Sequence, residues 1–297
     1  MSLNALYHCA GISKQSFHQW LDRRFHEAEE LALLRPILEQ LRADHPRMSV
    51  KVMYRMVRPK TLGRDRFIAA CAQWDLLLPR ERSPYRTTDS LGVTRFTNLL
   101  EGAEVTGVNQ FWTSDITYYR LGEEVYYITL IIELYSRRII GWRLSDSLRT
   151  DDTTLPALSM ALRLRKGRDI SKLVFHSDGG GQYYCKEFLK LLRKAGIRSS
   201  MCEHAWENPY SERVNGTIKN DYLIPWGPET RAQLALSLDR AIRLYNGQRP
   251  HSSIGYNTPL AVDEHTELFT ELTVINKEKR SKREKSHQHQ PMELTLS

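Results

Sequence analysis

Leu173-Val174-Phe175-His176-Ser177-Asp178-Gly179-Gly180-Gly181-Gln182-Tyr183 is the stretch from which the rest of the chain can be interpreted. A short apolar run bounded by glycine predicts a buried central strand. The glycines allow a sharp turn or the close approach of another backbone. Asp178 is therefore predicted at the carboxyl end of a strand, where open α/β sheets bind ligands. The structural alternative is an aspartate that only caps a turn.

The composition is that of an ordinary globular chain with an excess of basic residues. Of its 297 residues, 41% are hydrophobic and 26% are charged, and the formal net charge is +8. This length suffices for one good core and one or two small accessory domains. A basic protein gains affinity for a polyanion by releasing condensed counterions, so nucleic acid is the favoured partner class.

Cysteine usage and hydropathy indicate where the protein works. Cys9, Cys71, Cys185 and Cys202 are scattered and form no CxxC pair, so neither a zinc site nor a disulfide framework is predicted. No apolar run approaches the ~18 residues that span a bilayer, and no basic and apolar leader follows Met1. We expect a protein of the reducing cytoplasm that is neither exported nor inserted into a membrane.

The first 24 residues have the outline of a helix-turn-helix. A short helical pattern from Leu3 to Ala10 is followed by a turn, and Ser13 can cap a second helix from Lys14 to Arg24. We expect Phe17, Trp20 and Leu21 of this helix to pack inward. The outward side chains would then be available for phosphates or base edges in a major groove; they are Lys14, Gln15, His18 and Gln19. Two packed helices with a solvated face are the alternative.

A second helical unit is predicted before residue 80. The stretch from His26 to Leu41 is amphipathic and should be interrupted near Pro36. Ser49 can cap a helix that ends at Val57, and another helix is predicted from Arg64 to Trp74. The turn between them gathers basic side chains that suit phosphate contacts, namely Arg58, Lys60, Arg64 and Arg66. We therefore expect residues 1–79 to form a helical DNA-binding region and residues 80–108 to form a basic linker.

A second acid lies within the aromatic and β-branched stretch from Phe111 to Tyr119, which predicts a strand. Asp115 is near the middle of this strand, and burying an unpaired charge is costly, so a cation is expected beside it. Strands from Val125 to Tyr135 and from Ile139 to Ser145 complete a predicted antiparallel meander.

Helices and strands alternate after the meander. A helix from Thr150 to Arg165 precedes the strand that ends at Asp178, and a helix from Lys186 to Ala195, a strand from Ile197 to Met201 and a helix from Asn208 to Tyr222 follow. This β-β-β-α-β-α-β-α order is a ribonuclease H-like plan. The predicted class is α/β, with a mixed five-stranded sheet and flanking helices, preceded by the small all-α helix-turn-helix region.

The last of these helices carries the third acid, Glu212. Asn215, Gly216 and Lys219 share its face, as a phosphate-backbone surface beside a metal site would require, although a solvated helix is the alternative. Three hard oxygen ligands with open coordination positions suit Mg²⁺ or Mn²⁺. Two such ions about 4 Å apart can activate a water or a 3′-hydroxyl group and stabilise the leaving oxygen of a phosphodiester.

Short sequence motifs in a fixed order resemble those of the retroviral-integrase-type DDE core of bacterial insertion-sequence transposases, the second-reading-frame proteins of these elements. The motifs cover Asn109 to about Ala261 and are Asn109–Tyr118, Leu134–Arg137, His176–Asp178, Gly181–Tyr183, Glu212–Lys219, Tyr245-Asn246, Arg249–Tyr256 and Thr258-Pro259. The resemblance implies that Asp115, Asp178 and Glu212 are the catalytic triad and hold the metal ions.

The chain departs from the family pattern at three places. Glu133 stands where the family often has Asp, and Gly179-Gly180 follows Asp178 where Arg-Gly is more usual. Glu212 lies 34 residues after Asp178, slightly less than the usual offset, and the shortening falls between Cys202 and Pro209. Glu203 and Glu207 are therefore alternatives for the third ligand.

The C-terminal part contains one predicted core helix, capped by Thr230 and bearing an apolar stripe to Tyr245. In the loop-like segment from Gln248 to Pro259, Arg249 and His251 are candidates for DNA contact, with a solvated loop as the alternative. We assign residues 109–262 to the catalytic core and residues 263–297 to a C-terminal extension. Six basic and two acidic residues between 277 and 285 predict a disordered basic tail.

The resemblance implies a transposase that binds double-stranded DNA at the ends of its element, cuts a strand and joins the freed 3′-hydroxyl to another phosphodiester. It also implies a homo-oligomer that synapses two ends, and in many relatives an upstream frame is fused to the catalytic chain. Two rivals remain: a ribonuclease H-like nuclease without strand transfer, and a catalytically inactive DNA-binding regulator.

Overall fold

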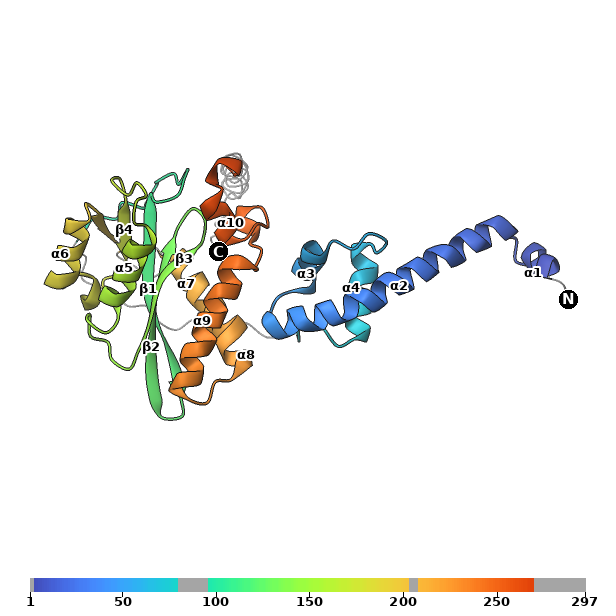
Figure 1. Cartoon of the computed structure of the whole chain (residues 1–297), viewed down its shortest axis with the longest axis horizontal. Coiled ribbons are helices and arrows are strands. Elements are labelled where there is room, and N and C mark those ends of the chain that lie inside the picture. The colour runs from blue at the N-terminus through green and yellow to red at the C-terminus, as the bar shows by residue number, and fades with distance from the viewer. Residues whose placement is uncertain (1–2, 80–95, 203–207, 270–297) are drawn as a thin grey trace, which may run out of the picture. The chain divides into compact units, whose positions relative to one another are not determined.

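The computed structural model describes residues 3–79, 96–202 and 208–269. The chain divides into two compact units, residues 1–83 and 84–297 (Figure 1). The predicted basic run of the linker at residues 80–88, the predicted tail at 277–285 and both alternative ligands, Glu203 and Glu207, lie outside the described residues.

The first unit contains four helices in its described part: α1 (Leu3–Cys9), α2 (Lys14–Asp44), α3 (Val50–Val57) and α4 (Arg64–Gln73). Its core forms where the second half of α2 packs against α3 and α4, around Leu38, Met53 and Phe67. Glu27 of α2 is buried and accepts a hydrogen bond of 2.8 Å from Arg66 of α4. This ion pair and the apolar cluster together hold the three helices to one another.

Two expectations for this unit were wrong. The helix does not break at Pro36, because Ala32, whose carbonyl loses its partner, lies at the surface, while Leu34 and Leu38 on either side of the proline are buried in the core. Trp20 and Leu21 do not pack inward; they remain 47% and 46% exposed. α1 is too short to cover them and, although the ring of Tyr7 lies 5.4 Å from that of Phe17, contributes no buried residue.

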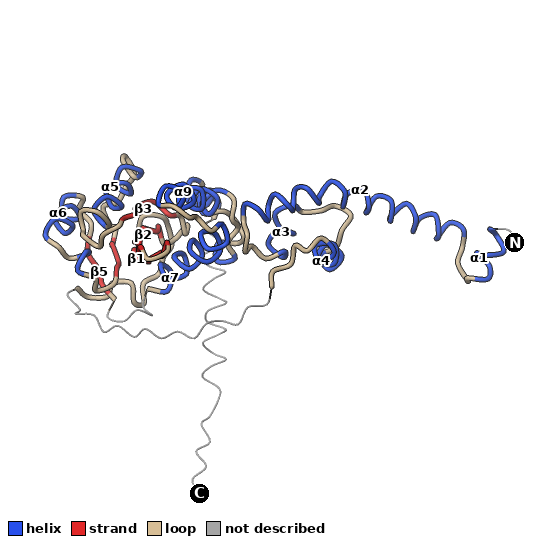
Figure 2. Tube along the Cα trace, turned by 90° about the horizontal axis from the view of Figure 1, so that it is seen from below, coloured by secondary structure: helices blue, strands red, loops and turns tan. Residues whose placement is uncertain are grey.

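The second unit is built on a five-stranded sheet. Its strands are β1 (Phe111–Leu121), β2 (Glu124–Glu133), β3 (Ile139–Ser145), β4 (Val174–Ser177) and β5 (Arg198–Met201), in the order β3-β2-β1-β4-β5 (Figure 2). The meander β1-β2-β3 is antiparallel, and β4 and β5 are added parallel to β1. The mixed sheet with flanking helices agrees with the predicted ribonuclease H-like class.

Helices cover both faces of the sheet. α5 (Thr154–Leu164) and α6 (Lys186–Lys194) pack on the face that carries Trp112, Ile131 and Phe175. α7 (Pro209–Gly216) and α9 (Arg231–Gly247) pack on the face that carries Ile128, Leu130 and Ile132, so the two sets lie on opposite sides in Figure 1.

Gly141 of β3 sets how closely α5 approaches the sheet. A Cβ atom at this position would lie 2.3 Å from the carbonyl oxygen of Ala157, far inside van der Waals contact. Only glycine therefore allows the backbone of α5 to lie directly on the strand.

The helix that begins as α7 changes its winding. Residues Thr217–Leu223 form a π-helical segment, labelled η3, in which the N–H of Ile224 bonds the carbonyl of Lys219 five residues earlier. α8 (Ile224–Trp226) continues the chain to the left-handed Gly227. Val214 on one side of the transition and Ile218, Tyr222 and Leu223 on the other all enter the core shared with α9.

A buried ionic cluster ties the last helix, α10 (Pro259–Glu264), to the sheet. The fully buried carboxylate of Asp263 pairs with Arg165 at 2.5 Å and with Arg138 at 2.6 Å. Glu133, at the end of β2, is also fully buried; it accepts hydrogen bonds from the backbone N–H and the hydroxyl of Ser136, and burial raises its pKa. Ser136 links the two acids, because its hydroxyl also lies 3.4 Å from Asp263.

Candidate active site

The register of two parallel strands brings two acids together. In the β1–β4 pairing, Ser114 lies opposite Ser177, and β4 ends there. The next residues, Asp115 and Asp178, therefore lie side by side at the carboxyl end of the parallel pair. β1 stays paired with β2 as far as Leu121. Its pairing with β4, on the opposite edge, stops at Ser114, just before Asp115.

The backbone after Asp178 fixes the direction of its carboxylate. The N–H of Gly180 donates a hydrogen bond of 3.1 Å to Oδ1 of Asp178. A Cβ atom on residue 180 would lie 3.1 Å from that oxygen and 3.0 Å from Oε1 of Gln182, so a side chain there would crowd the carboxylate. Burial raises the pKa of Asp178, and the Gly180 hydrogen bond partly opposes that rise.

Both oxygens of Asp115 are engaged. Oδ1 accepts from the N–H of Ile116 at 2.8 Å, and Oδ2 accepts from the side-chain amide of Asn215 at 2.9 Å. Burial raises the pKa of Asp115 to about 6, with a further rise from the charge of Asp178. The two hydrogen bonds limit this rise, and Glu212 adds a smaller like-charge effect.

A hydrogen-bonded ladder holds α7 against β1. The amide of Asn208 donates to the carbonyl of Ser114 at 3.0 Å, the hydroxyl of Ser211 donates to Oγ1 of Thr113 at 2.9 Å, and Asn215 reaches Asp115. These three α7-side residues recur every three or four positions and so share one face of the helix. Sequence reasoning missed Asn208 and Ser211 in this role, although their spacing was the available signal.

The third predicted ligand is placed differently. Glu212 lies in the first turn of α7, next to Ser211, and is partly exposed. Within residues 3–79, 96–202 and 208–269, no three His, Cys, Asp or Glu side chains are close enough to hold one metal ion. The structure therefore brings Asp115 and Asp178 together and leaves Glu212 outside the pair.

The chemistry of the Asp115–Asp178 pair fits a hard divalent cation. Two half-buried carboxylates with raised pKa values share an edge of the sheet, and each is oriented by hydrogen bonds. A divalent cation between them would remove the repulsion that raises the pKa of Asp115. Carboxylate oxygens are also the ligands that Mg²⁺ and Mn²⁺ prefer.

The predicted DNA contacts lie in different environments. Lys14, Gln15, His18 and Gln19 are all exposed at the start of α2. At the start of α4, Arg64 pairs with Asp65 at 2.9 Å and Arg66 with Glu27 at 2.8 Å. Lys219 lies 4.2 Å above the ring of Tyr118, and burial lowers its pKa. Asn215 is buried against Asp115 and does not face outward.

Arg249 and His251 are held by contacts within the protein. Arg249 donates to Asp221 at 2.6 Å, and its side chain is 17% exposed. The imidazole of His251 packs against the ring of Tyr245 at 4.6 Å. Contact of these two residues with DNA stays a prediction.

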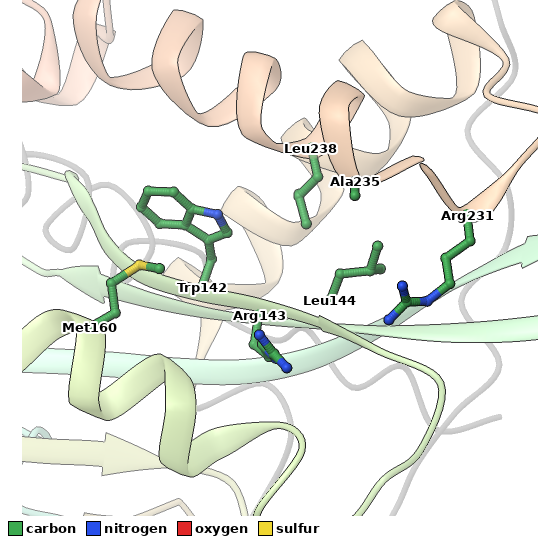
Figure 3. Close-up of a pocket in the computed structure, with 7 residues that line it drawn as sticks. All are labelled: Trp142, Arg143, Leu144, Met160, Arg231, Ala235 and Leu238. Atoms are coloured by element: carbon green, nitrogen blue, oxygen red, sulfur yellow. The ribbon is translucent and has the colours of Figure 1, made fainter. Parts of the chain in front are cut away.

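A cavity of about 280 Å³ lies elsewhere, at the β3 edge of the sheet (Figure 3). Its lining comes from β3, α5 and α9 and consists of Trp142, Arg143, Leu144, Met160, Arg231, Ala235 and Leu238. Trp142 and Met160 lie at one end and Arg231 at the other. Two strands separate this edge from Asp178, so the cavity is distinct from the acidic pair.

Comparison with known families identifies the second unit. Two family models, both described as integrase core domain, match residues 105–205 and 195–259. An uncharacterised 31 kDa protein of insertion element IS600 from Shigella sonnei is 26% identical over 265 residues, which are 86% of this chain and 96% of that protein.

Two transposases match shorter regions. The transposase for IS629 from Shigella sonnei is 30% identical over 153 residues, 51% of this chain and 50% of that protein. Transposase InsF for IS3A from Escherichia coli is 39% identical over 106 residues, 35% of each chain. Among solved structures, the HTLV-2 integrase catalytic core in complex with magnesium covers 52% of this chain and 95% of that one, with 19% identity and a TM-score of 0.42.

The two family-model matches, with which the sheet order and the paired acids at the β1–β4 edge agree, define an integrase core domain. The chain belongs to the insertion-sequence transposases that carry this domain, the family of IS3, IS600 and IS629. Membership implies a role in DNA transposition and binding to DNA. In the described ranges, no helix has both the length and the apolar character needed to cross a bilayer.

Proposed function

We propose that this protein is a transposase that cuts the ends of its insertion sequence and joins the freed 3′-hydroxyl groups to target DNA. The observation that carries the proposal is the adjacency of Asp115 and Asp178 at the carboxyl end of β1 and β4. Two half-buried, oriented carboxylates destabilise each other unless a cation lies between them, and a cation at this position is what phosphoryl transfer requires.

In this proposal Asp115, Asp178 and Glu212 hold Mg²⁺ or Mn²⁺, with two ions at full occupancy. The ions would activate the attacking oxygen and stabilise the charge on the leaving one. Glu212 would join the pair from α7, whose contact with β1 is already fixed by the ladder of Asn208, Ser211 and Asn215. The catalytic residues themselves form no covalent intermediate, because their role is to position charge.

The remaining side chains orient the acids and the DNA. Asn215 and Gly180 each fix one carboxylate oxygen. Lys219 lies seven residues after Glu212 and is partly exposed over Tyr118, so its ammonium group is available to a phosphate of the reacting strand. We propose that Lys14, Gln15, His18 and Gln19 contact the element end from the exposed start of α2.

We also propose the division of labour along the chain. Residues 1–79 would recognise DNA, residues 80–108 would link, residues 109–262 would carry catalysis, and residues 263–297 would extend the core. A homo-oligomer would bring two element ends together, with or without an upstream-frame helix-turn-helix protein, in the bacterial cytoplasm at the nucleoid.

A strand-transfer assay tests the proposed reaction. Purified full-length protein is incubated with Mg²⁺ or Mn²⁺ and a labelled, pre-cleaved duplex that carries the terminal repeat of its element. Asp178→Asn keeps the shape of the side chain but removes a charged ligand. Asp169→Asn is the matched control, because Asp169 is an exposed loop carboxylate before β4.

We expect joined product from wild type and from Asp169→Asn, and none from Asp178→Asn. Hydrolysis without joining would favour the nuclease. Binding without either reaction, in the presence of any upstream-frame protein, would favour the inactive regulator.

A further inference from the structure

A group of basic side chains surrounds Tyr245 of α9. Tyr245 is buried, and the ring of His251 lies 4.6 Å from it. Arg137 approaches from the β2–β3 turn and Arg249 from the segment that follows α9. Both guanidinium groups act electrostatically on Tyr245 and on His251, which places them near this ring pair.

Aromatic rings hold the two arginines from opposite ends of the α7–η3 helix. Cζ of Arg137 lies 4.3 Å from the ring centre of Tyr210, and Cζ of Arg249 lies 5.6 Å from that of Tyr222. Nη2 of Arg249 is also bonded to Asp221. Stacking fixes the plane of a guanidinium group without using its N–H donors. Arg249 also hydrogen-bonds the side chains of Asp221 and Tyr222, which leaves its Nη1 as the donor available to a ligand.

Three polar atoms of this group lack partners. Nη1 of Arg137, Nη1 of Arg249 and Nε2 of His251 are buried, and none has a hydrogen-bond partner in the described part of the chain. Buried polar atoms are normally satisfied, and several orphans in one place indicate a missing ligand. Other atoms of Arg137 and Arg249 remain partly exposed, so the group lies near the surface.

The charge of the region is positive. Arg137, Arg249 and Arg213 of α7 all act on Tyr245 as cations. Burial, together with the charges of Arg249 and Arg137, lowers the pKa of His251 to about 3, so the imidazole is neutral at neutral pH. Like charges gathered at a half-buried position repel each other, and an anion among them would relieve that repulsion.

We propose that Arg137, Arg249 and His251 bind one phosphate group. This proposal rests on the proposed function in one respect: DNA would supply the group as a phosphodiester of the bound strand. A tetrahedral oxyanion accepts several N–H donors at once, and arginine forks are suited to it.

Inorganic phosphate is the first probe. The thermal midpoint of the full-length protein is measured in sodium phosphate and in sodium chloride of equal ionic strength. A ligand that binds only the folded state raises the midpoint. We expect phosphate to raise it most for wild type, less for Arg137→Lys, which keeps the charge but loses the stacked fork, and not at all for Arg137→Gln. Arg163→Gln, which removes an exposed charge from α5 on the opposite face of the sheet, is the matched control and should behave as wild type.

A DNA arm identifies the source of the phosphate. Duplexes with one uncharged methylphosphonate at successive backbone positions are compared in binding assays. A methylphosphonate at the contacted backbone position should lower the affinity of wild type by about 10-fold. Arg137→Gln should bind the unmodified duplex about 10-fold more weakly than wild type does, and the same methylphosphonate should not weaken its binding further. Loss of one phosphate contact should also reduce the slope of log affinity against log salt by about 0.9.

The outcomes separate this proposal from the proposed function. If phosphate stabilises wild type but not Arg137→Gln, and no DNA binds, the anion site stands with free phosphate as its ligand and the proposed function fails. If DNA binds and Arg137→Gln equals Arg163→Gln in both arms, the anion site is overturned while the proposed function stands.

Discussion

Asn215 donates a hydrogen bond of 2.9 Å to Oδ2 of Asp115 and so connects the helix that carries Glu212 to the strand that carries the first acid. Ser211 and Asn208 extend the same connection toward the N-terminus of α7. Partners of this kind orient metal ligands, and their loss typically weakens metal affinity by about 10- to 100-fold.

Asn215→Ala should therefore weaken Mn²⁺ binding by about 10-fold or more. Mn²⁺ affinity is measured by electron paramagnetic resonance of the free ion, which does not depend on activity. Asn220→Ala, an exposed amide in the same helical run, should bind as wild type does. Equal affinity of the two variants would exclude an orienting role for Asn215.

Asp115→Asn should stabilise the metal-free protein at neutral pH. The folded pKa of Asp115, about 6, lies above its ordinary value, so the folded state binds the proton more tightly than the unfolded state. The contribution of Asp115 to the free energy of unfolding is most favourable below its unfolded pKa and is lost as the pH rises through 6. The asparagine variant should gain on the order of 2 kcal/mol at pH 8 in chelator and much less at pH 4.

Chemical denaturation at the two pH values gives this difference directly. In saturating Mg²⁺ at pH 8, wild type should have the higher free energy of unfolding, because only wild type keeps the charged ligand. An asparagine variant that is less stable than wild type in chelator at pH 8 would contradict the raised pKa.

Gly141→Ala should destabilise the second unit by about 3 kcal/mol or more, because its Cβ would meet the backbone of α5 and no flexible side chain can move away. Urea denaturation followed by circular dichroism measures the loss. Gly107→Ala, whose Cβ would find its nearest neighbour at 3.9 Å, should stay within about 1 kcal/mol of wild type. Similar stabilities for the two variants would mean that α5 does not lie as close to β3 as described.

Asp263→Asn should cost about 3 to 5 kcal/mol, since it leaves the buried Arg165 without its charged partner. Burial alone would raise the pKa of Asp263, but Arg165 and Arg138 hold it below its ordinary value. Its contribution is therefore present above the unfolded pKa and is lost only as the pH falls through the lower folded value.

The neighbouring acid provides the control for this prediction. Glu264 is 46% exposed and lies 3.6 Å from Arg138, so Glu264→Gln should change the free energy of unfolding by less than about 1 kcal/mol. A loss as large as that of Asp263→Asn would mean that the cluster is stabilised by the total charge near Arg138.

Sequence patterns predicted the elements of the second unit because its strands and helices differ in period and are separated by glycines and turns. They also predicted that Asp178 would follow the end of one strand and that Asp115 would lie within another, but the pairing of these two strands comes from the structure. They did not predict which side of α7 meets the sheet. Asn215 and Lys219 share a face with Glu212 on a helical wheel, yet the structure buries the first against Asp115 and leaves the second partly exposed over Tyr118.

Long-range pairing explains the other differences. The inward packing expected for Trp20 needed a partner helix, and α1 with its seven residues is too small to provide one. The helix break expected at Pro36 was avoided because buried leucines on either side hold α2 together. Glu133 could be read from sequence only as a variant of aspartate, whereas its longer side chain reaches both Ser136 and the N–H of Asn109.

The change of winding after α7 has a consequence for how such a chain can vary. A π-helical segment contains one residue more than an α-helix would need to cover the same rise. Side chains before Thr217 face β1, and side chains after it face α9. The segment Thr217–Leu223 therefore separates two parts of one helix whose buried faces point in different directions. Natural or engineered length changes of one residue should accumulate in this segment, where they convert π turns to α turns. They should be absent from Pro209–Gly216, because there they would rotate Glu212 away from the acids.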